Sequence, residues 1–353
     1  MAQGTRVGIV GAGWPGRKHA EGYLAAGGFT VAAVADLIPS RRRAVMEQFG
    51  ASREYAEAEE LIADKDVEVV SLCLPNHLHL PVALAALKAG KHVVCETPPA
   101  LTAGEARKVA AAAAKAGKTV LYAMQRRFGG NEQAAKQAVE KGYAGNVLHA
   151  RAAWTRTRGV PSGTGWYADR ARSGGGAVID LGLHMLDLGW SLLGQPRPLT
   201  AFAVFPGLGT AALSGDAVEI PGQSAASRVE ESGFALLKFE GGRSLELGAS
   251  WAINQPPQHQ GTSCRAYGDK GAVEVYRADG PALYRGFAAS GEAKETILKL
   301  PRLIHHAAMM RHLKECLLGR AAPAVGAEQG VLLMQMVDAI YKSAASGKSI
   351  DVR

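Results

Sequence analysis

The feature that most constrains this chain is a glycine-rich stretch at residues 6–20, which reads RVGIVGAGWPGRKHA. Its apolar start is typical of a buried strand, and its glycines follow the spacing G-x-G-x-x-G ahead of a helical pattern. In such a unit the first glycine permits a tight turn, the second lets a pyrophosphate approach the backbone, and the third lets helix and strand pack closely. The phosphates would then bind the free N–H groups at the helix N-terminus. The expected phosphate-binding residues are Gly11, Gly13, Trp14, Pro15 and Gly16.

The glycine spacing alone is weak evidence, because the chain contains 43 glycines. An acidic residue further along the sequence strengthens the interpretation. The apolar run Phe29–Ala35 ends at Asp36, 20 residues beyond Gly16. A dinucleotide-binding fold places there the acid that accepts hydrogen bonds from the adenosine ribose, although Asp36 could also be an ordinary strand-end cap. Its charge favours NAD, because it would repel the 2′-phosphate of NADP. Arg41 is close enough to receive that phosphate, so NADP stays possible.

Strands and helices alternate over residues 6–124, which predicts a doubly wound parallel sheet. The run Val67–Leu74 is almost continuously apolar, as in a parallel strand covered on both faces. The other expected strands after Asp36 are Lys91–Glu96 and Thr119–Met124, and the expected helices are Arg41–Phe49, Glu57–Ala63, Leu80–Ala89 and Ala103–Ala116. We therefore expect a dinucleotide-binding Rossmann domain at residues 1–124.

The pattern changes beyond residue 124, and residues 125–353 predict an α/β domain with a large, open, mostly antiparallel sheet. The segment 147–157 alternates like a strand, and residues 159–176 are rich in Gly and Ser, as in a loop. Further alternating segments are TAFAVF, SGFALLKF, RSLELGASW, SCRAYG and AVEVY. The expected helices are Asn131–Glu140, Val178–Leu193, Ile304–Leu318 and Glu328–Ser346.

Composition narrows the class of protein. A length of 353 residues predicts about two domains. The net charge of +8 is spread along the chain, and no zinc-finger spacing or basic heptad region suggests a nucleic-acid partner. The four cysteines are far apart, without a C-x-x-C, so we expect free thiols and no metal site. We see no signal peptide and no apolar run long enough for a membrane span, so we expect a cytoplasmic protein.

Several polar stretches follow the expected strands. In a doubly wound sheet, ligands bind beyond the carboxyl ends of the strands. The residues expected there to contact the cofactor are Pro75, Asn76, His79, Glu96 and Gln125. Asn76 and His79 could instead be turn and helix-cap residues, and Glu96 could serve only to fix a backbone turn.

A second polar constellation follows the triplet Gly174-Gly175-Gly176. Asp180 and His184 are four residues apart, so they would share one face of a helix. A carboxylate beside an imidazole suits general acid/base chemistry near neutral pH. His184 could instead be a satisfied interface histidine, and Asp187 suits a structural role better than a catalytic one.

Taken together, these motifs resemble the Gfo/Idh/MocA family of NAD(P)-dependent sugar and cyclitol oxidoreductases. The resemblance covers nearly the whole chain and rests on GAGWPG, LPNHLH, ALKAGKHVVCETP, QRRF and GGGAVIDLGLHMLDL. It implies a Rossmann domain followed by an α/β domain whose open sheet often forms an oligomer interface, hence a homodimer or homotetramer. It also implies a nicotinamide at the sheet edge with a sugar or polyol stacked on it.

One position departs from the family pattern. The family has a Glu-Lys-Pro motif, whose lysine usually handles the substrate hydroxyl proton together with an aspartate and a histidine. Asp180 and His184 match the latter two, but Thr97 stands in place of the lysine. A threonine hydroxyl carries no charge and cannot act as a base near pH 7. The resemblance therefore implies His184 as the base, oriented by Asp180, with Thr97 beside the reacting group.

Four residues are candidates for substrate contacts: Arg127, Arg156, Trp166 and Tyr167. Arg156, Arg158 or Lys91 could supply the missing positive charge, and the aromatic residues suit a core as well as a sugar-stacking surface. Three functions remain open. The first is oxidation of a secondary hydroxyl of a sugar, glycoside or cyclitol. The second is a glycosidase or lyase that uses a transient oxidation without net redox change. The third is non-catalytic dinucleotide binding.

Overall fold

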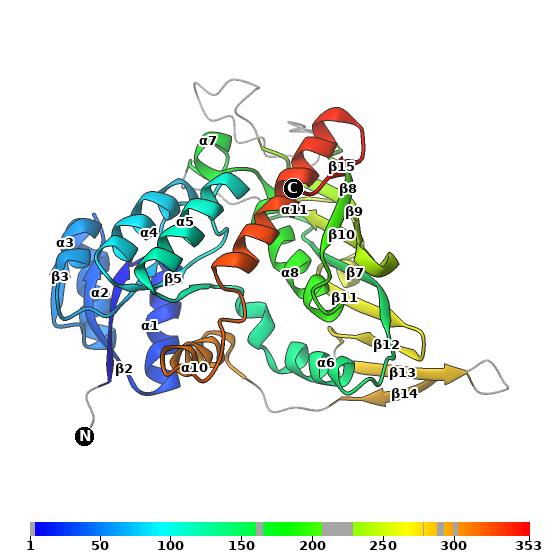
Figure 1. Cartoon of the computed structure of the whole chain (residues 1–353), viewed down its shortest axis with the longest axis horizontal. Coiled ribbons are helices and arrows are strands. Elements are labelled where there is room, and N and C mark those ends of the chain that lie inside the picture. The colour runs from blue at the N-terminus through cyan, green and yellow to red at the C-terminus, as the bar shows by residue number, and fades with distance from the viewer. Residues whose placement is uncertain (1–3, 160–164, 207–228, 278, 288–292, 299–302) are drawn as a thin grey trace. The chain divides into compact units, whose positions relative to one another are not determined.

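The structure is a computed structural model, which describes residues 4–159, 165–206, 229–277, 279–287, 293–298 and 303–353 (Figure 1). Residues 160–164 of the expected Gly- and Ser-rich loop lie outside the described residues. The chain divides into two compact units. The first comprises Met1–Gly129 and Leu303–Met334, and the second comprises Gly130–Arg302 and Gln335–Arg353.

The first unit contains a parallel sheet, in which six strands of the described residues have the order β3-β2-β1-β4-β5-β6. These strands are β1 (Thr5–Val10), β2 (Phe29–Ala35), β3 (Arg53–Tyr55), β4 (Val69–Leu72), β5 (His92–Cys95) and β6 (Val120–Tyr122). The order reverses beside β1, which is where ligands bind in a doubly wound sheet. The expected fold is confirmed, although the short polar strand β3 was not expected.

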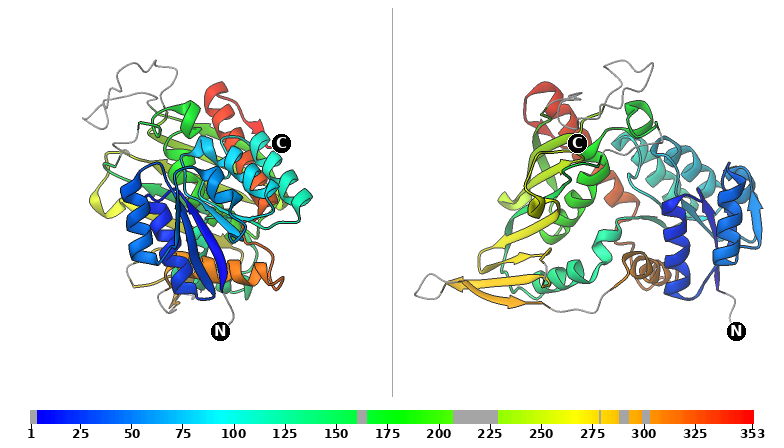
Figure 2. Two further views of the ribbon diagram at one scale, coloured as in Figure 1. Left: turned by 90° about the vertical axis from the view of Figure 1, so that its left-hand side faces the viewer. Right: turned by 180° about the vertical axis from the view of Figure 1, so that it is seen from behind.

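Helices cover both faces of this sheet. They are α1 (Trp14–Ala26), α2 (Pro39–Phe49), α3 (Ala58–Ala63), α4 (His79–Lys88), α5 (Ala103–Ala116) and α10 (His305–Leu317), with short 3₁₀ turns η1 (Asn76–Leu78) and η2 (Gln125–Phe128). Helix α1 packs against α2 and α10, whereas α4 packs against α3 and α5 (Figures 1 and 2). Right-handed crossovers to the two sides of β1 place these groups on opposite faces.

Helix α10 belongs to the core of the first unit although it lies far along the sequence. Its Met309, Met310 and Leu313 are fully buried in one cluster with Val7 and Ile9 of β1. Burying these three side chains stabilises the unit by about 1.5–3 kcal/mol each. The sequence prediction assigned all of residues 125–353 to the second domain, whereas residues 303–334 group with the first unit.

The second unit contains a mixed sheet, in which nine of the described strands have the order β14-β13-β12-β11-β7-β10-β9-β8-β15. They are β7 (Val147–Thr155), β8 (Pro198–Val204), β9 (Ser232–Phe239), β10 (Ser244–Ser250), β11 (Gly261–Gly268), β12 (Gly271–Glu274), β13 (Ala282–Phe287), β14 (Ala293–Ile297) and β15 (Ile350–Asp351). Only the pair β7–β10 is parallel among these described strands. The expected open, mostly antiparallel sheet is confirmed.

One face of this sheet is covered by helices. Helix α8 (Leu183–Leu192) packs on β7, β10 and β11, and α6 (Gly130–Glu140) packs on β12 and β13. Helix α7 (Arg170–Ser173) also belongs to this unit, and the division between the two units falls within α11 (Ala327–Ser346), after Met334. The expected helix over Val178–Leu193 is confirmed, but its first turn, η3 (Val178–Gly182), is π-helical and runs into α8. Among the described helices, none combines the length and apolar character needed to cross a membrane.

Candidate active site

The glycine motif has the conformation that its spacing predicts. Gly11 has φ +93°, and a Cβ atom there would overlap the carbonyl oxygen of Cys73. A Cβ atom on Gly16 would overlap the carbonyl oxygen of Gly11. A Cβ atom on Gly13 would meet only Pro15 Cδ, at 3.8 Å. Gly11 and Gly16 are therefore required by close contacts within the chain itself. At Gly13, by contrast, the absence of a side chain leaves open space in front of α1.

Asp36 links the end of β2 to the glycine loop. Its Oδ2 accepts a hydrogen bond from the Ala12 amide at 2.8 Å, and its Oδ1 accepts one from the Ile38 amide at 2.8 Å. The carboxylate is only 8% exposed, and the guanidinium of Arg41 lies 4.0 Å away. Each oxygen keeps a lone pair that can accept a ribose hydroxyl. Asp36 is thus both a strand-end cap and a candidate cofactor ligand.

The loops after β4 and β5 are joined by His79. Its ring is fully buried, with Nδ1 at 2.8 Å from the Pro98 carbonyl oxygen and Nε2 at 2.9 Å from the Leu74 carbonyl oxygen. Burial lowers the pKa of His79. Because both ring nitrogens face backbone oxygens, this side chain braces the edge of the sheet. Pro75 and Asn76 lie in the same loop, where Asn76 starts η1 and is 8% exposed.

Glu96 ends a chain of polar side chains that the sequence did not reveal. His19 Nε2 lies 3.0 Å from Glu96 Oε1, and the Thr97 amide donates to Glu96 Oε2 at 3.1 Å. His19 Nδ1 lies 3.0 Å from Ser71 Oγ, which lies 2.8 Å from Tyr23 Oη. Burial acts to raise the pKa of Glu96, but the hydrogen bond with His19 lowers it to about 2. Glu96 is therefore a fixed, ionised carboxylate at the carboxyl end of β5.

The 3₁₀ turn η2 follows β6 and carries two of the predicted site residues. Arg127 is buried, and its Nη1 donates to the Ala324 carbonyl oxygen at 3.1 Å. That hydrogen bond ties η2 to the segment between α10 and α11. The buried Gln125 Oε1 has no hydrogen-bond partner among the described residues.

The second unit places Asp180 in the π-helical turn η3, directly ahead of His184 at the start of α8. Asp180 Oδ2 accepts a hydrogen bond from Trp251 Nε1 at 2.7 Å. Burial raises the pKa of Asp180, while the Trp251 indole and the charge of Arg156 oppose that change. His184 is 8% exposed. Single π turns inside helices occur often at functional sites, so this irregular turn supports the predicted role of its side chains.

An aromatic and a cationic side chain flank these two residues. The ring centroids of Trp154 and His184 are 6.1 Å apart, with the planes tilted by 51°. The Arg156 guanidinium lies over the Trp154 ring, with Cζ 5.3 Å from its centroid. An imidazole, a carboxylate, a guanidinium and two indole rings therefore lie close together. Trp251 was missed by the sequence analysis, because a tryptophan after a strand carries no signal of its own.

The triple-glycine loop is held by Glu230, another residue that the sequence analysis missed. Its carboxylate accepts hydrogen bonds from the amides of Gly176 and Val178 at 3.0 Å and from Tyr341 Oη at 2.6 Å. A Cβ atom on Gly175 would overlap the Tyr341 hydroxyl, and one on Gly176 would overlap the Glu230 backbone. Burial raises the pKa of Glu230. These contacts fix the backbone that leads into Asp180 and His184.

Comparison with known families identifies the chain. Residues 5–124 match the oxidoreductase family model of the NAD-binding Rossmann fold, GFO_IDH_MocA, and residues 133–274 match the GFO/IDH/MocA C-terminal domain. The chain belongs to the Gfo/Idh/MocA family of oxidoreductases. It is 32% identical over 349 residues to the D-glucoside 3-dehydrogenase of Escherichia coli (strain K12), covering 98% of this chain and 97% of that protein.

Solved structures of other oxidoreductases have the same fold. An aldose-aldose oxidoreductase from Caulobacter crescentus, complexed with glycerol, is 26% identical with a TM-score of 0.81, and the match covers 99% of both chains. A levoglucosan dehydrogenase in complex with NADH and levoglucosan has a TM-score of 0.83 at 21% identity, covering 99% of this chain and 100% of that chain. The resemblance inferred from the sequence motifs is therefore confirmed.

In this member of the Gfo/Idh/MocA family, Lys91, one candidate source of positive charge, does not lie beside Thr97. It precedes β5, and its Nζ donates to the carbonyl oxygens of Asp64 and Val67, each at 2.6 Å. Thr97 follows the same strand, so the two residues lie at opposite ends of β5. Burial lowers the pKa of Lys91. The peptide bond Thr97–Pro98 is cis.

The remaining predicted substrate contacts are Trp166 and Tyr167. Their rings stack with centroids 3.8 Å apart and planes inclined by 26°. Both side chains are partly exposed. They lie in the loop ahead of α7, and the stacked pair presents a flat apolar surface of the kind that sugars contact.

Proposed function

We propose that this chain is an NAD-dependent oxidoreductase that transfers a hydride from a secondary hydroxyl of a sugar or glycoside. The observation that carries the proposal is the cluster around His184, where Asp180, Arg156 and two indole rings gather. Similarity to D-glucoside 3-dehydrogenase over nearly the whole chain supports glucosides as the first substrates to test. The C3 hydroxyl is accordingly the proposed site of oxidation.

The first unit fits a bound dinucleotide. The open space at Gly13, the helix N-terminus without a side-chain cap, and the free lone pairs of Asp36 suit a pyrophosphate and a ribose. The cofactor ligands predicted at the strand ends are Pro75, Asn76, His79, Glu96 and Gln125. NAD, when bound, supplies the acceptor of the hydride. The protein must bind it, orient it and keep water away.

His184 takes the proton of the reacting hydroxyl in this proposal. A positioned base contributes typically 10²–10⁴-fold to the rate. Asp180, whose carboxylate is held by the Trp251 indole, orients the imidazole and compensates its charge once it is protonated. Arg156 supplies positive charge near the oxygen, which stabilises developing negative charge in a site of low dielectric. Thr97 can donate one neutral hydrogen bond, and Trp166 and Tyr167 offer an apolar surface for the sugar ring.

The activity is tested with the full chain, NAD and a panel of methyl and aryl glucosides, with NADH followed by its absorbance and the product analysed for a ketone. We expect NADH formation in step with a 3-keto product. Absence of NADH from every sugar, together with tight NAD binding, would contradict the proposal.

Thr97 favours a second candidate, a glycosidase or lyase with transient oxidation. Without an ammonium group beside the substrate, net alcohol oxidation is less strongly assisted. An oxidised C3 acidifies the C–H bond at C2, so the aglycone can be eliminated from C1. Addition of water to the resulting enone and reduction of the ketone by the NADH formed in the first step would complete the reaction and leave NAD unchanged. Release of aglycone without net NADH from an aryl glucoside would select this second candidate.

Asp36 leads us to propose NAD as the preferred cofactor. Its buried carboxylate would lie against the 2′-phosphate of NADP, and Arg41 at 4.0 Å only partly compensates it. Calorimetric titration of NAD and NADP should give tighter binding of NAD. Tighter binding of NADP would contradict the assignment.

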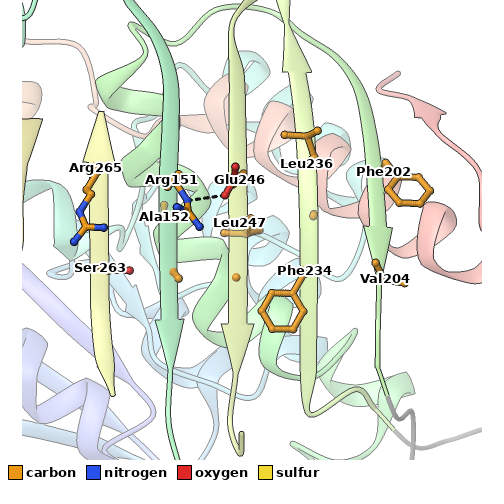
Figure 3. Close-up of a pocket in the computed structure, with 13 residues that line it drawn as sticks. Arg151, Ala152, Phe202, Val204, Phe234, Leu236, Glu246, Leu247, Ser263 and Arg265 are labelled. Atoms are coloured by element: carbon orange, nitrogen blue, oxygen red, sulfur yellow. Dashed lines mark ion pairs between the residues drawn. The ribbon is translucent and has the colours of Figure 1, made fainter. Parts of the chain in front are cut away.

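We also propose that the open face of the second sheet binds a second copy of the chain. If this face of the sheet were in contact with water only, we would expect polar side chains at the outward positions of β8 and β9. The side chains found there are apolar and 38–57% exposed: Phe202, Val204, Phe234 and Leu236. Figure 3 shows these side chains on neighbouring strands around a shallow hollow, beside the ion pair of Arg151 and Glu246 at 2.6 Å. Contiguous apolar patches of this kind mark interaction surfaces.

Light scattering of the native chain should give a dimer or tetramer. Leu236→Asp should dissociate it, whereas Leu148→Asp, at another exposed leucine outside the hollow, should not. A monomeric native chain at micromolar concentration would contradict this proposal.

A further inference from the structure

Three metal-ligating side chains from distant parts of the sequence meet in the first unit. They are His19 of α1, Glu96 after β5 and His306 of α10, and one ligand atom from each lies within 4.8 Å of the others. His19 Nε2 and Glu96 Oε1 are already 3.0 Å apart. The His19 and His306 rings are 5.8 Å apart between centroids, with planes inclined by 53°.

We propose that His19, Glu96 and His306 form a binding site for a divalent transition-metal ion such as Zn²⁺. Two imidazoles and one carboxylate are a ligand set that zinc uses in proteins, with water in the fourth position. The proposed site shares Glu96 with the predicted cofactor ligands, but its metal binding requires neither a cofactor nor a sugar and can be measured without them.

The required adjustment of the side chains is small. Ligand atoms 2.0–2.1 Å from a tetrahedral zinc lie about 3.4 Å from one another. The pair formed by His19 and Glu96 is already near that spacing, at 3.0 Å. Since its ligand atom lies within 4.8 Å of the other two, His306 must approach by at most about 1.4 Å to reach that spacing.

Hydrogen bonds beyond the three ligands would orient them. A ligating histidine usually donates its other ring N–H to a fixed acceptor, and His19 Nδ1 lies 3.0 Å from Ser71 Oγ. Without metal, Ser71 can donate to Nδ1 while Nε2–H donates to Glu96. With metal, His19 Nδ1–H can donate to Ser71 Oγ, and the Ser71 hydroxyl can donate to Tyr23 Oη, since each hydroxyl both donates and accepts. The lone pair of His19 Nε2 is then free to bind the ion. Glu96 keeps the Thr97 amide on its other oxygen.

Packing and exposure also suit a metal ion. A Cβ atom on Gly22, one helical turn after His19, would come within 3.0–3.2 Å of the His306 backbone and Cβ atoms. The glycine therefore allows α10 to approach α1 closely enough to bring His306 to the site. His19 is fully buried, but Glu96 is 15% exposed and His306 is partly exposed. An ion can thus enter from the side of Glu96 and His306.

The test uses the full chain without an affinity tag, stripped with a chelator and titrated calorimetrically with Zn²⁺. The variant His306→Asn removes one ligand, and His305→Asn changes its neighbour on the same helix as a matched control. Ser71→Ala removes the hydroxyl behind His19. A parallel titration with Co²⁺ reports the ligand field through its visible absorption, and NAD titration checks that each variant is folded.

We expect one Zn²⁺ per chain, lost or weakened by about 100-fold or more in His306→Asn. Ser71→Ala should weaken it about 10- to 100-fold, the usual effect of removing a partner of a ligand. His305→Asn should bind within twofold of the native chain and keep the Co²⁺ spectrum. No Zn²⁺ binding by the native chain, or equal binding by His306→Asn, would overturn the proposal.

Discussion

Replacing Glu230 tests how the second unit holds Asp180 and His184, its proposed catalytic residues. The variant Glu230→Gln keeps the volume of the side chain but places an NH₂ group among three donors, the amides of Gly176 and Val178 and the hydroxyl of Tyr341. All three donors reach Oε1, and the Gly176 amide is shared with Oε2. The NH₂ group therefore replaces an acceptor of the Gly176 amide, which costs about 1–3 kcal/mol, and the other hydrogen bonds lose their charged partner. Because glutamine is neutral, the variant no longer has to bury the charge of the carboxylate, and this offsets part of the lost stability. We expect the loop to be destabilised by about 2–4 kcal/mol.

Amide hydrogen exchange measures this effect locally. A tenfold change corresponds to about 1.4 kcal/mol, so the amides of Gly176 and Val178 should exchange about 30- to 1,000-fold faster in Glu230→Gln. The matched variant Tyr341→Phe removes a single donor and leaves the carboxylate on both amides. It should accelerate exchange at the same amides only about 5- to 10-fold.

Enzyme kinetics give a second measurement for the same variant. Asp180 and His184 follow this loop directly, so kcat should fall in Glu230→Gln while NAD affinity, which the first unit supplies, stays unchanged. Exchange at Gly176 and Val178 within twofold of the native rate in Glu230→Gln would refute the reasoning. Equal effects of Glu230→Gln and Tyr341→Phe would also refute it.

Three further outcomes are expected. In steady-state assays, His184→Ala should lower kcat about 10²–10⁴-fold, because it removes the proposed base. Thr97→Ala removes one neutral hydrogen bond of about 0.5–1.5 kcal/mol, so it should lower kcat about 10-fold or less. In calorimetric titrations, Asp36→Asn should bind NAD more weakly than the native chain and should discriminate less between NAD and NADP. The substitution removes the negative charge but keeps an acceptor for the Ala12 amide. Burial lowers the pKa of His306 to about 4, so the native state binds fewer protons than the unfolded chain between pH 4 and about 6.5. Stability in urea with chelator should therefore fall by up to about 3 kcal/mol as the pH drops through that window, and His306→Asn should flatten the dependence.

The fold could be predicted where its signals are local. The glycine spacing, the apolar strands and the helix-ending glycines each act within a few residues, so the doubly wound sheet followed from them. The three-residue strand β3, Arg53–Tyr55, is polar and lies at the edge of the sheet, and no periodicity marks it. Helix α10 was predicted as a helix, but its apolar face could not indicate that it packs against α1 in the first unit.

Of the candidate active site, the sequence allowed prediction only of residues within the short motif that follows the triple glycine. Asp180 and His184 stand in one short segment, and their spacing could be read directly. Trp251 and Glu230 come from segments about 50–70 residues further along the chain, where the sheet brings them beside the π turn. Neither residue has a pattern of its own. The π turn itself cannot be read from a sequence that is as apolar as the α-helix after it.

Long-range contacts of this kind also hold three carboxylates of the described residues that bear on the proposed function. Asp36 is held by the amides of Ala12 and Ile38, Glu96 by His19 and the Thr97 amide, and Glu230 by two amides and a hydroxyl. Asp36 and Glu230 each accept an amide from a loop of another segment, whereas Glu96 joins the His19 side chain of α1 to the amide of its own neighbour Thr97. A carboxylate used in this way fixes backbone geometry in addition to carrying charge. Its replacement therefore changes the loop even where no ligand touches it, which is why an amide that keeps an acceptor is the appropriate first variant at each position.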